Sequence, residues 1–238
     1  MSRPGNCSLA LVVAAALPAC SGNTGPSGVD YHPELPSAWA ASVSNPYFPL
    51  VPGTVFTYRL ETSGGVETER VEVLADTREI QGVQATIVHD QVSVNGELAE
   101  DTFDWYAQGT DGTVWYLGED SKEIEHGAVV STEGSWEWGV NGALPGVVMW
   151  ADPGSHLNEQ YRQELSEGVA EDLASVVAVN QAVQVPSGDL SGCIETRDWN
   201  ALESGSVEHK YYCPRVGLVL ETDQGGGQRN ELTGVTGP

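Results

Sequence analysis

The chain has 238 residues, with 34 acidic side chains against 10 basic ones and a net charge of −24. Such an excess of negative charge repels nucleic acid and anionic lipid, so we expect no nucleic-acid partner. Two explanations of the acidity stay open: a surface adapted to salt, and a site that binds cations.

The first twenty residues have the pattern of a bacterial export signal. A lone Arg3 precedes an apolar run, Leu9 to Leu17, that is too short to span a bilayer. Leu17-Pro18-Ala19-Cys20 then resembles a lipobox, which predicts a signal peptide over 1–19 and a lipid on Cys20. We expect a protein anchored in membrane lipid through Cys20, in the outer membrane of a Gram-negative cell. The alternative is ordinary cleavage near Ala14–Ala16 and secretion.

Residues 20–44 contain Pro26, Gly28, Pro33 and Pro36, which are typical of a flexible linker. Residues 45–238 are then long enough for a single domain.

The domain consists of short alternating segments rich in Val, Thr, Tyr and Trp, separated by Gly-containing turns. This pattern predicts an all-β fold, a single antiparallel meander that forms a barrel or a strongly curved sheet. We expect no strand in the Gly/Pro-rich stretch 139–154, and we favour a strand over a helix for 167–177. Aromatic side chains favour a filled interior over a ligand cavity. The predicted strands are 54–62, 67–74, 84–94, 98–106, 113–118, 129–138, 159–165, 174–185, 216–222 and 229–234, together with a hairpin between the last two cysteines.

Four cysteines are present, of which Cys7 leaves with the signal peptide and Cys20 carries the lipid. A hairpin centred on Glu203 places Cys193 opposite Cys213, and an oxidising compartment favours a disulfide between them. Two free thiols are the alternative.

Two turns predict an opposed pair of carboxylates. If Asn95-Gly96 and Asp111-Gly112 each centre a simple hairpin, Asp104 lies beside Ile87 and opposite Glu119. Like charges there are unfavourable unless a shared proton, an arginine or a cation intervenes. A one-residue bulge would instead move these side chains to opposite faces.

The same registers place Gly134 opposite Glu119, and Asp120 across from Glu133 on the other face. Leu117 and Trp136 would share the face of Asp104. Calcium suits such oxygen-rich surroundings, so Asp104, Glu119, Asp120 and Glu133 are the candidate metal ligands and calcium the candidate cofactor.

Several aromatic and polar side chains are candidates to contact a ligand. Arg162 is a candidate counter-ion for Glu164 or the acids that follow it. His209 is expected opposite Arg197, in a hydrogen-bonding role. No nucleophile elbow and no zinc-ligand spacing is found, so we assign no catalytic residue. The candidate ligand-binding residues are Trp105, Tyr106, Trp115, Trp136, Arg162, Glu164 and His209.

Six sequence runs carry a resemblance to a known family. They are Asn45 to Leu50 with Pro52-Gly53-Thr54, Asp104 to Gln108, Val114 to Asp120, Gly134 to Glu137, Tyr161 to Glu164 and Val207 to Tyr212. In these runs the chain resembles an uncharacterised family of secreted bacterial β-rich proteins and lipoproteins. The resemblance implies one exported β-rich domain and brings no activity; the cysteines at 193 and 213 depart from the family pattern.

Together these features predict an exported lipoprotein that acts as a binding or envelope-associated module, with an unknown small ligand or envelope protein as partner. One alternative is an extracytoplasmic hydrolase that uses paired carboxylates about 5–9.5 Å apart. Another is a purely structural envelope protein, which would have a filled interior and an exposed apolar patch. We favour the binding module over an enzyme because carboxylates are too abundant for any pair to be diagnostic.

Overall fold

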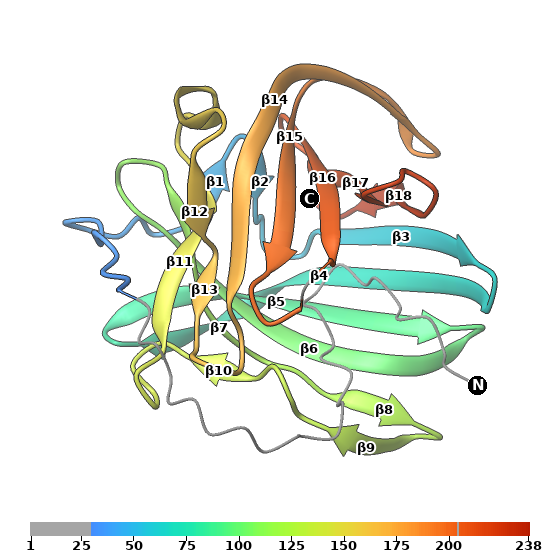
Figure 1. Ribbon diagram of the computed structural model, residues 1–238, viewed down its shortest axis with the longest axis horizontal. Coiled ribbons are helices and arrows are strands. Elements are labelled where there is room, and N and C mark those ends of the chain that lie inside the picture. Colours follow the sequence, from blue (N-terminus) through green and yellow to red (C-terminus); the bar gives the residue numbers. More distant parts are fainter. Residues whose placement is uncertain (1–29, 204) are drawn as a thin grey trace.

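Antiparallel strands make up most of this protein, as the alternating pattern predicts (Figure 1). The computed structural model describes residues 30–203 and 205–238, so the signal peptide and Cys20 lie outside the described residues. The elements are β1 (Ser44–Asn45), β2 (Phe48–Pro49), β3 (Val55–Thr62), β4 (Gly65–Ile80), β5 (Val83–Val94), β6 (Glu97–Gln108), β7 (Val114–Asp120), β8 (Glu123–Glu125), β9 (Ala128–Ser131), β10 (Trp136–Glu137), β11 (Leu144–Met149), η1 (Pro153–His156), β12 (Gln160–Arg162), β13 (Glu164–Leu165), β14 (Asp172–Val185), β15 (Gly188–Asn200), β16 (Val207–Cys213), β17 (Gly217–Asp223) and β18 (Arg229–Thr236).

One sheet of 16 strands contains all of these strands except the β1–β2 pair. Its main path runs β12-β14-β15-β16-β17-β18-β3-β4-β5-β6-β7-β11-β13. Figure 1 shows β14 to β16 crossing in front of β3 to β6 at a steep angle, so the sheet folds over and its two halves face each other. The sheet is strongly curved, as predicted, and is not a closed barrel. Its two ends, β12 and β13, are separated only by Gln163.

Strand β11 corrects the expectation that 139–154 contains no strand. It pairs with both β7 and β13. Gly146 makes this possible, because a Cβ there would collide with the backbone of Arg162 and Gln163. The glycine marks a close approach between strands rather than a loop.

Two other expectations change in extent: the predicted strand 129–138 is divided into β9 and β10, and the segment 167–177 is extended only from Asp172 onward.

The β5–β6 hairpin has the predicted two-residue turn at Asn95-Gly96, with both residues at positive φ. A bulge then shifts the register between Val92 and Ser93, so Val88 lies opposite Asp104 where Ile87 was expected. The bulge moves every later side chain of this ladder by one position.

The Asp104–Glu119 pairing is as predicted, although the turn between β6 and β7 is not the simple hairpin assumed. The ladder begins with Gln108 opposite Val114, one residue out of register. A shift between Trp105 and Tyr106 then restores it. Because of this bulge Leu117 packs in the cluster of Trp105 and not on the Asp104 face. Trp136, not Gly134, lies opposite Glu119, and Phe103 lies opposite Asp120.

The predicted disulfide between Cys193 and Cys213 is present, in the hairpin register with Arg197 opposite His209. The cysteines belong to the largest apolar cluster of the interior.

Part of the predicted linker packs on the domain: Val43 is in the same cluster, and the Trp39 ring lies 6.4 Å from that of Trp115. Within the described residues, no helix has the length and apolar character that crossing a membrane requires.

Candidate functional site

The folded-over sheet forms a cavity of about 130 Å³ that is partly open to solvent. By this measure a single water needs about 10–15 Å³, so the cavity has room for several waters or a small organic molecule. One part of its wall is apolar and aromatic, and the other part is acidic. The apolar part includes Phe48, Leu50, Phe56, Tyr58, Val71, Val88, Tyr106, Tyr116, Val148, Tyr212, Val216 and Leu218, and the polar part is Asp90, Asp104, Gln163, Glu164, Asp172 and Lys210.

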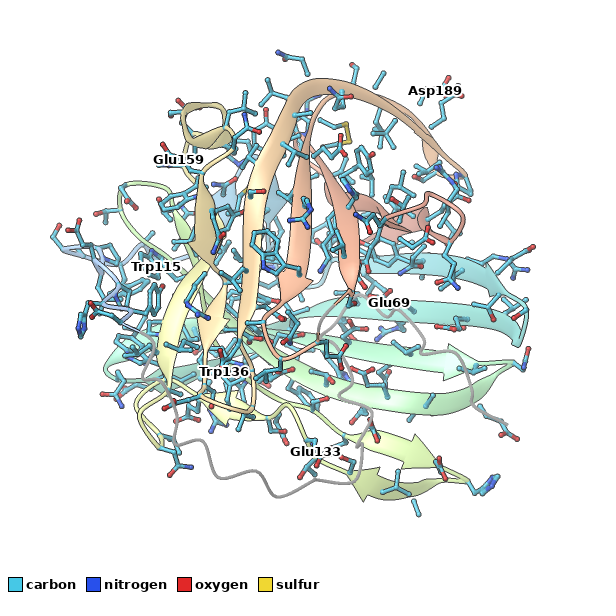
Figure 2. The ribbon with its side chains drawn as sticks, viewed as in Figure 1. Glu69, Trp115, Glu133, Trp136, Glu159 and Asp189 are labelled. Atoms are coloured by element: carbon cyan, nitrogen blue, oxygen red, sulfur yellow. A yellow bond between two sulfur atoms is a disulfide. The ribbon has the colours of Figure 1, made fainter. Side chains whose placement is uncertain are left out.

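The polar wall belongs to a larger set of interior acids that we call the carboxyl belt. Strand alternation places at least one acid from each of many neighbouring strands on the inward face. Figure 2 shows Glu69 in the region where β16 passes over the strands of the other half of the sheet. The members are Glu69, Asp90, Glu100, Asp104, Glu119, Glu164, Asp172, Asp198, Glu208 and Glu221.

Burial raises the pKa of nine of these carboxyls, because the charged form loses its hydration inside the protein. They are Glu69, Asp90, Glu100, Asp104, Glu119, Glu164, Asp172, Asp198 and Glu221. The pKa of Asp172 rises to about 6, that of Glu69 to about 7 and that of Glu100 to about 8. For Glu164 and Glu221, burial and then nearby negative charge raise the pKa well above its ordinary value. Part of the carboxyl belt is therefore protonated near neutral pH.

Pairs of belt carboxyls hydrogen-bond directly to each other. Glu164 pairs with Asp172, and Glu69 pairs with Asp90. Two carboxylates can form such a bond only when they share a proton, so each pair titrates as a unit. Apart from these pairings, Asp90 Oδ1, Asp172 Oδ1 and both Glu164 oxygens are buried without a hydrogen-bond donor from the described residues.

Lys210 is the one basic side chain in the cavity wall among the described residues. Its Nζ lies 3.7 Å from Asp198 and 3.9 Å from Glu208. Burial lowers the pKa of Lys210, but the charges of Glu221, Asp198 and Glu208 outweigh burial and raise it well above its ordinary value. Lys210 therefore stays charged, and the acids that balance it lie outside the cavity wall.

The predicted carboxylate pair lies inside the carboxyl belt. Asp104 accepts a hydrogen bond of 2.5 Å from Tyr116 Oη, whereas neither oxygen of Glu119 has a hydrogen-bond donor among residues 30–203 and 205–238. Burial raises the pKa of Asp104 to about 7. For Glu119, burial followed by the charges of Glu164 and Asp104 raises the pKa well above its ordinary value. Protonation and the hydrogen bond from the Tyr116 hydroxyl thus reduce the repulsion between the opposed acids.

The other two candidate metal ligands lie elsewhere. Asp120 pairs with Lys122 and has a half-exposed side chain, so it does not face Glu133 as expected. Figure 2 shows Glu133 beside the β8–β9 hairpin. No group of three or more His, Cys, Asp or Glu side chains in the described part of the chain has the arrangement of a metal site. Calcium binding at these four residues stays a hypothesis.

The candidate ligand-binding residues divide between the cavity and its surroundings. Tyr106 and Glu164 line the cavity. Trp105 and Trp115 pack in a neighbouring apolar cluster, and Trp136 packs edge-on against Tyr116.

The two remaining candidates, Arg162 and His209, do not line the cavity. Arg162 lies 5.9 Å from the ring of Tyr31, and Lys210 takes the interior position expected for a basic group. His209 Nδ1 lies 2.7 Å from Glu195, in the hydrogen-bonding role predicted for it.

Sequence reasoning missed Asp90, Lys210 and the ring of tyrosines at 58, 116 and 212. One signal was available: in Val207–Cys213 alternation places Glu208, Lys210 and Tyr212 on one face and His209 and Tyr211 on the other. The sequence analysis chose His209 as the candidate residue of this strand, and His209 lies on the outer face. The acids resembled surface positions because polar residues can fill a whole inward face, as Glu100, Thr102 and Asp104 do on β6.

No protein-family model matches the chain, and no curated protein matches it either. Two solved structures are distantly similar. One is a presumed exported protein with a YmcC-like fold from Bacteroides fragilis, 14% identical, with a TM-score of 0.47 over 80% of this chain and 98% of that one. The other is a presumed lipoprotein from Parabacteroides distasonis, 9% identical, with a TM-score of 0.42 over the same shares. Likeness at this level assigns no function.

Proposed function

We propose that this protein is an exported binding module, tethered to a bacterial membrane through Cys20, that holds a small molecule in its interior cavity. The observation that carries the proposal is the cavity itself, about 130 Å³ in volume with one apolar and one acidic wall. Small-molecule sites commonly combine an apolar lining with a few convergent polar groups that orient the ligand.

The interior contains a cavity, whereas the aromatic residues of the sequence favoured a completely filled core. Phe48, Tyr106, Tyr116 and Tyr212 do pack together, with the Tyr106 and Tyr116 rings stacked at 4.9 Å and the Phe48 and Tyr106 rings edge-on at 5.1 Å. They form the side of the cavity rather than its filling. An engineered cavity of about 150 Å³ in another protein holds benzene, so a benzyl group is a suitable probe size.

The paired carboxyls do not favour the hydrolase alternative. Glu164 and Asp172 are in direct hydrogen-bonding contact. A glycosidase needs its two carboxyls about 5–9.5 Å apart to accommodate the sugar and a water or covalent bond. The Glu164–Asp172 pair therefore fits the binding of a positively charged group better than sugar hydrolysis.

A cavity-filling substitution tests the proposal. Val148→Phe adds volume into the cavity, whereas Val219→Phe adds the same volume to a fully buried core position that does not line it. We expect Val219→Phe to lower the free energy of unfolding by about 1–3 kcal/mol through overpacking, and Val148→Phe to lower it by under about 1 kcal/mol. Val148→Phe should also abolish the binding of benzyl alcohol and benzylamine. Equal destabilisation by both variants, with neither probe bound by the unsubstituted protein, would refute the cavity as a binding site.

A further inference from the structure

The cavity wall has more carboxyl groups than basic groups that could pair with them. Asp90, Asp104, Glu164 and Asp172 all line it. Lys210 is the sole basic side chain that the described residues contribute to this wall, and it is engaged by Asp198, Glu208 and Glu221 from outside it. None of the four lining acids forms an ion pair with Lys210, although its charge acts to lower the pKa of Asp172.

Hydrogen bonding leads to the same conclusion from independent evidence. Glu164 is only 1% exposed, and both of its oxygens lie beside the Trp136 indole and the Asp172 carboxyl without a well-aligned N–H or hydroxyl donor from the described residues. Asp172 Oδ1 and Asp90 Oδ1 are also buried with no donor of good geometry beyond the carboxyl that each one faces. Buried polar atoms normally have a partner, and each one left without is unfavourable. A ligand with several donors on one charged atom would satisfy these oxygens.

The opposite wall suits the rest of such a ligand. Tyr58, Tyr106, Tyr116 and Tyr212 line the cavity beside the acids, and Phe56, Val88, Val148 and Leu218 form its apolar part. Aromatic ring faces attract cations, most strongly where water is excluded, and they also pack against apolar groups. The combination of carboxylates and tyrosines on one cavity is typical of sites for organic ammonium ions.

We propose, building on the function proposed above, that the cavity binds an organic cation: a primary ammonium group on a compact apolar or aromatic body. The ammonium donates hydrogen bonds to Glu164 and Asp172, with Asp90 and Asp104 facing it from the other half of the sheet. The body packs among the tyrosines and the apolar wall. A divalent metal ion fits less well, because the described acids form no metal-binding group.

Matched probes test the charge requirement on the exported protein at pH 8. Benzylamine, benzyl alcohol and benzoate have similar size and differ in charge. Hydrogen bonds to charged groups are worth more than neutral ones, so calorimetric titration should show benzylamine binding about 10- to 100-fold more tightly than benzyl alcohol. Benzoate should not bind detectably, because the cavity is already acidic.

Three variants locate the effect. Glu164→Gln and Asp172→Asn keep the shape of each side chain and prevent it from ionising against a bound ammonium group, so each should reduce the preference for benzylamine at least fivefold. Glu171→Gln is the matched control: Glu171 is buried nearby and accepts a hydrogen bond from the Gly168 amide, but it does not line the cavity. It should leave both affinities unchanged. Urea unfolding of each variant confirms that it is folded.

Each other outcome overturns the inference in a distinguishable way. Equal binding of benzylamine and benzyl alcohol, both blocked by Val148→Phe, would mean a cavity for neutral ligands and leave the proposed function intact. Stabilisation by calcium chloride without any effect of benzylamine would mean an inorganic cation. Benzylamine binding that survives Val148→Phe and both charge-removing variants would place the amine on the acidic surface.

Discussion

Replacing Asp104 by Asn should stabilise the protein, and increasingly so as the pH rises. Asn keeps an oxygen that can accept the 2.5 Å hydrogen bond from Tyr116, while it removes a carboxyl whose side chain is almost completely buried. The substitution therefore isolates the free energy of holding a charge at this position.

The magnitude follows from the pKa of Asp104, which burial raises from 3.8 to about 7. One pKa unit corresponds to about 1.4 kcal/mol, so ionising Asp104 costs the folded state roughly 4 kcal/mol. The folded form holds its proton more tightly than the unfolded form. Stability due to this group is thus complete below about pH 4, falls as the pH rises towards 7, and is constant above that.

Urea unfolding followed by tryptophan fluorescence at pH 3, 5 and 8 measures this difference. We expect the gain in unfolding free energy for Asp104→Asn to be near zero at pH 3 and about 2–4 kcal/mol at pH 8, the lower value allowing for neighbouring acids that take up the proton. Asp101→Asn is the matched control, because Asp101 lies on the same strand and bonds to His89 and Gln91 outside the carboxyl belt. It should cost up to about 1 kcal/mol. A gain that does not grow with pH, or a loss at pH 8, would refute the reasoning.

Four further outcomes are expected. Lys210→Met should lower the free energy of unfolding by about 3–5 kcal/mol at pH 8 and by less at pH 5, since it leaves Asp198, Glu208 and Glu221 without a cation; equal losses at both pH values in urea titrations would contradict this. Replacing Cys193 and Cys213 together by Ala should cost roughly 3 kcal/mol, because the bridge closes a loop with a sequence separation of 20; unfolding curves of the unsubstituted protein with and without reductant provide the comparison. Cys20→Ser should move the protein from the membrane fraction to the soluble fraction, and unchanged partitioning would exclude the lipid anchor. The affinity for benzylamine should fall from pH 8 to pH 5, because protons compete for carboxyls such as Asp104 and Asp172, whose pKa values lie at about 7 and about 6; a pH-independent affinity would show that these acids do not hold the amine.

Local patterns were enough to predict much of the fold. Alternation and Gly-containing turns predict the antiparallel meander, and the Cys193–Cys213 hairpin has the expected register. The two-residue turn at Asn95-Gly96 is also as expected, although a bulge then shifts its ladder by one residue. These features depend on neighbouring residues along one hairpin. Strand β11 was missed because Gly146 resembles a loop residue in the local sequence. The glycine is needed there because the backbone of Arg162 and Gln163, distant in the sequence, packs against it.

The site was harder to predict for the same physical reason. The Asp104–Glu119 pair was found because it lies within one hairpin, although its register depends on an offset turn and a compensating bulge. Asp90 meets Asp172 and Lys210 only when the sheet folds over, because its strand β5 lies far from β14 and β16 in the strand order. An acid on an alternating strand looks like a surface residue until the opposite half of the sheet covers it.

A crystal structure of the protein soaked with benzylamine at pH 8 tests the central claim most directly. The account predicts the ammonium nitrogen within about 2.7–3.2 Å of Glu164 and Asp172, with the ring among Tyr58, Tyr106 and Tyr212. An empty cavity with benzylamine bound only to surface carboxylates, or a ring inserted with its ammonium directed away from these acids, would contradict it.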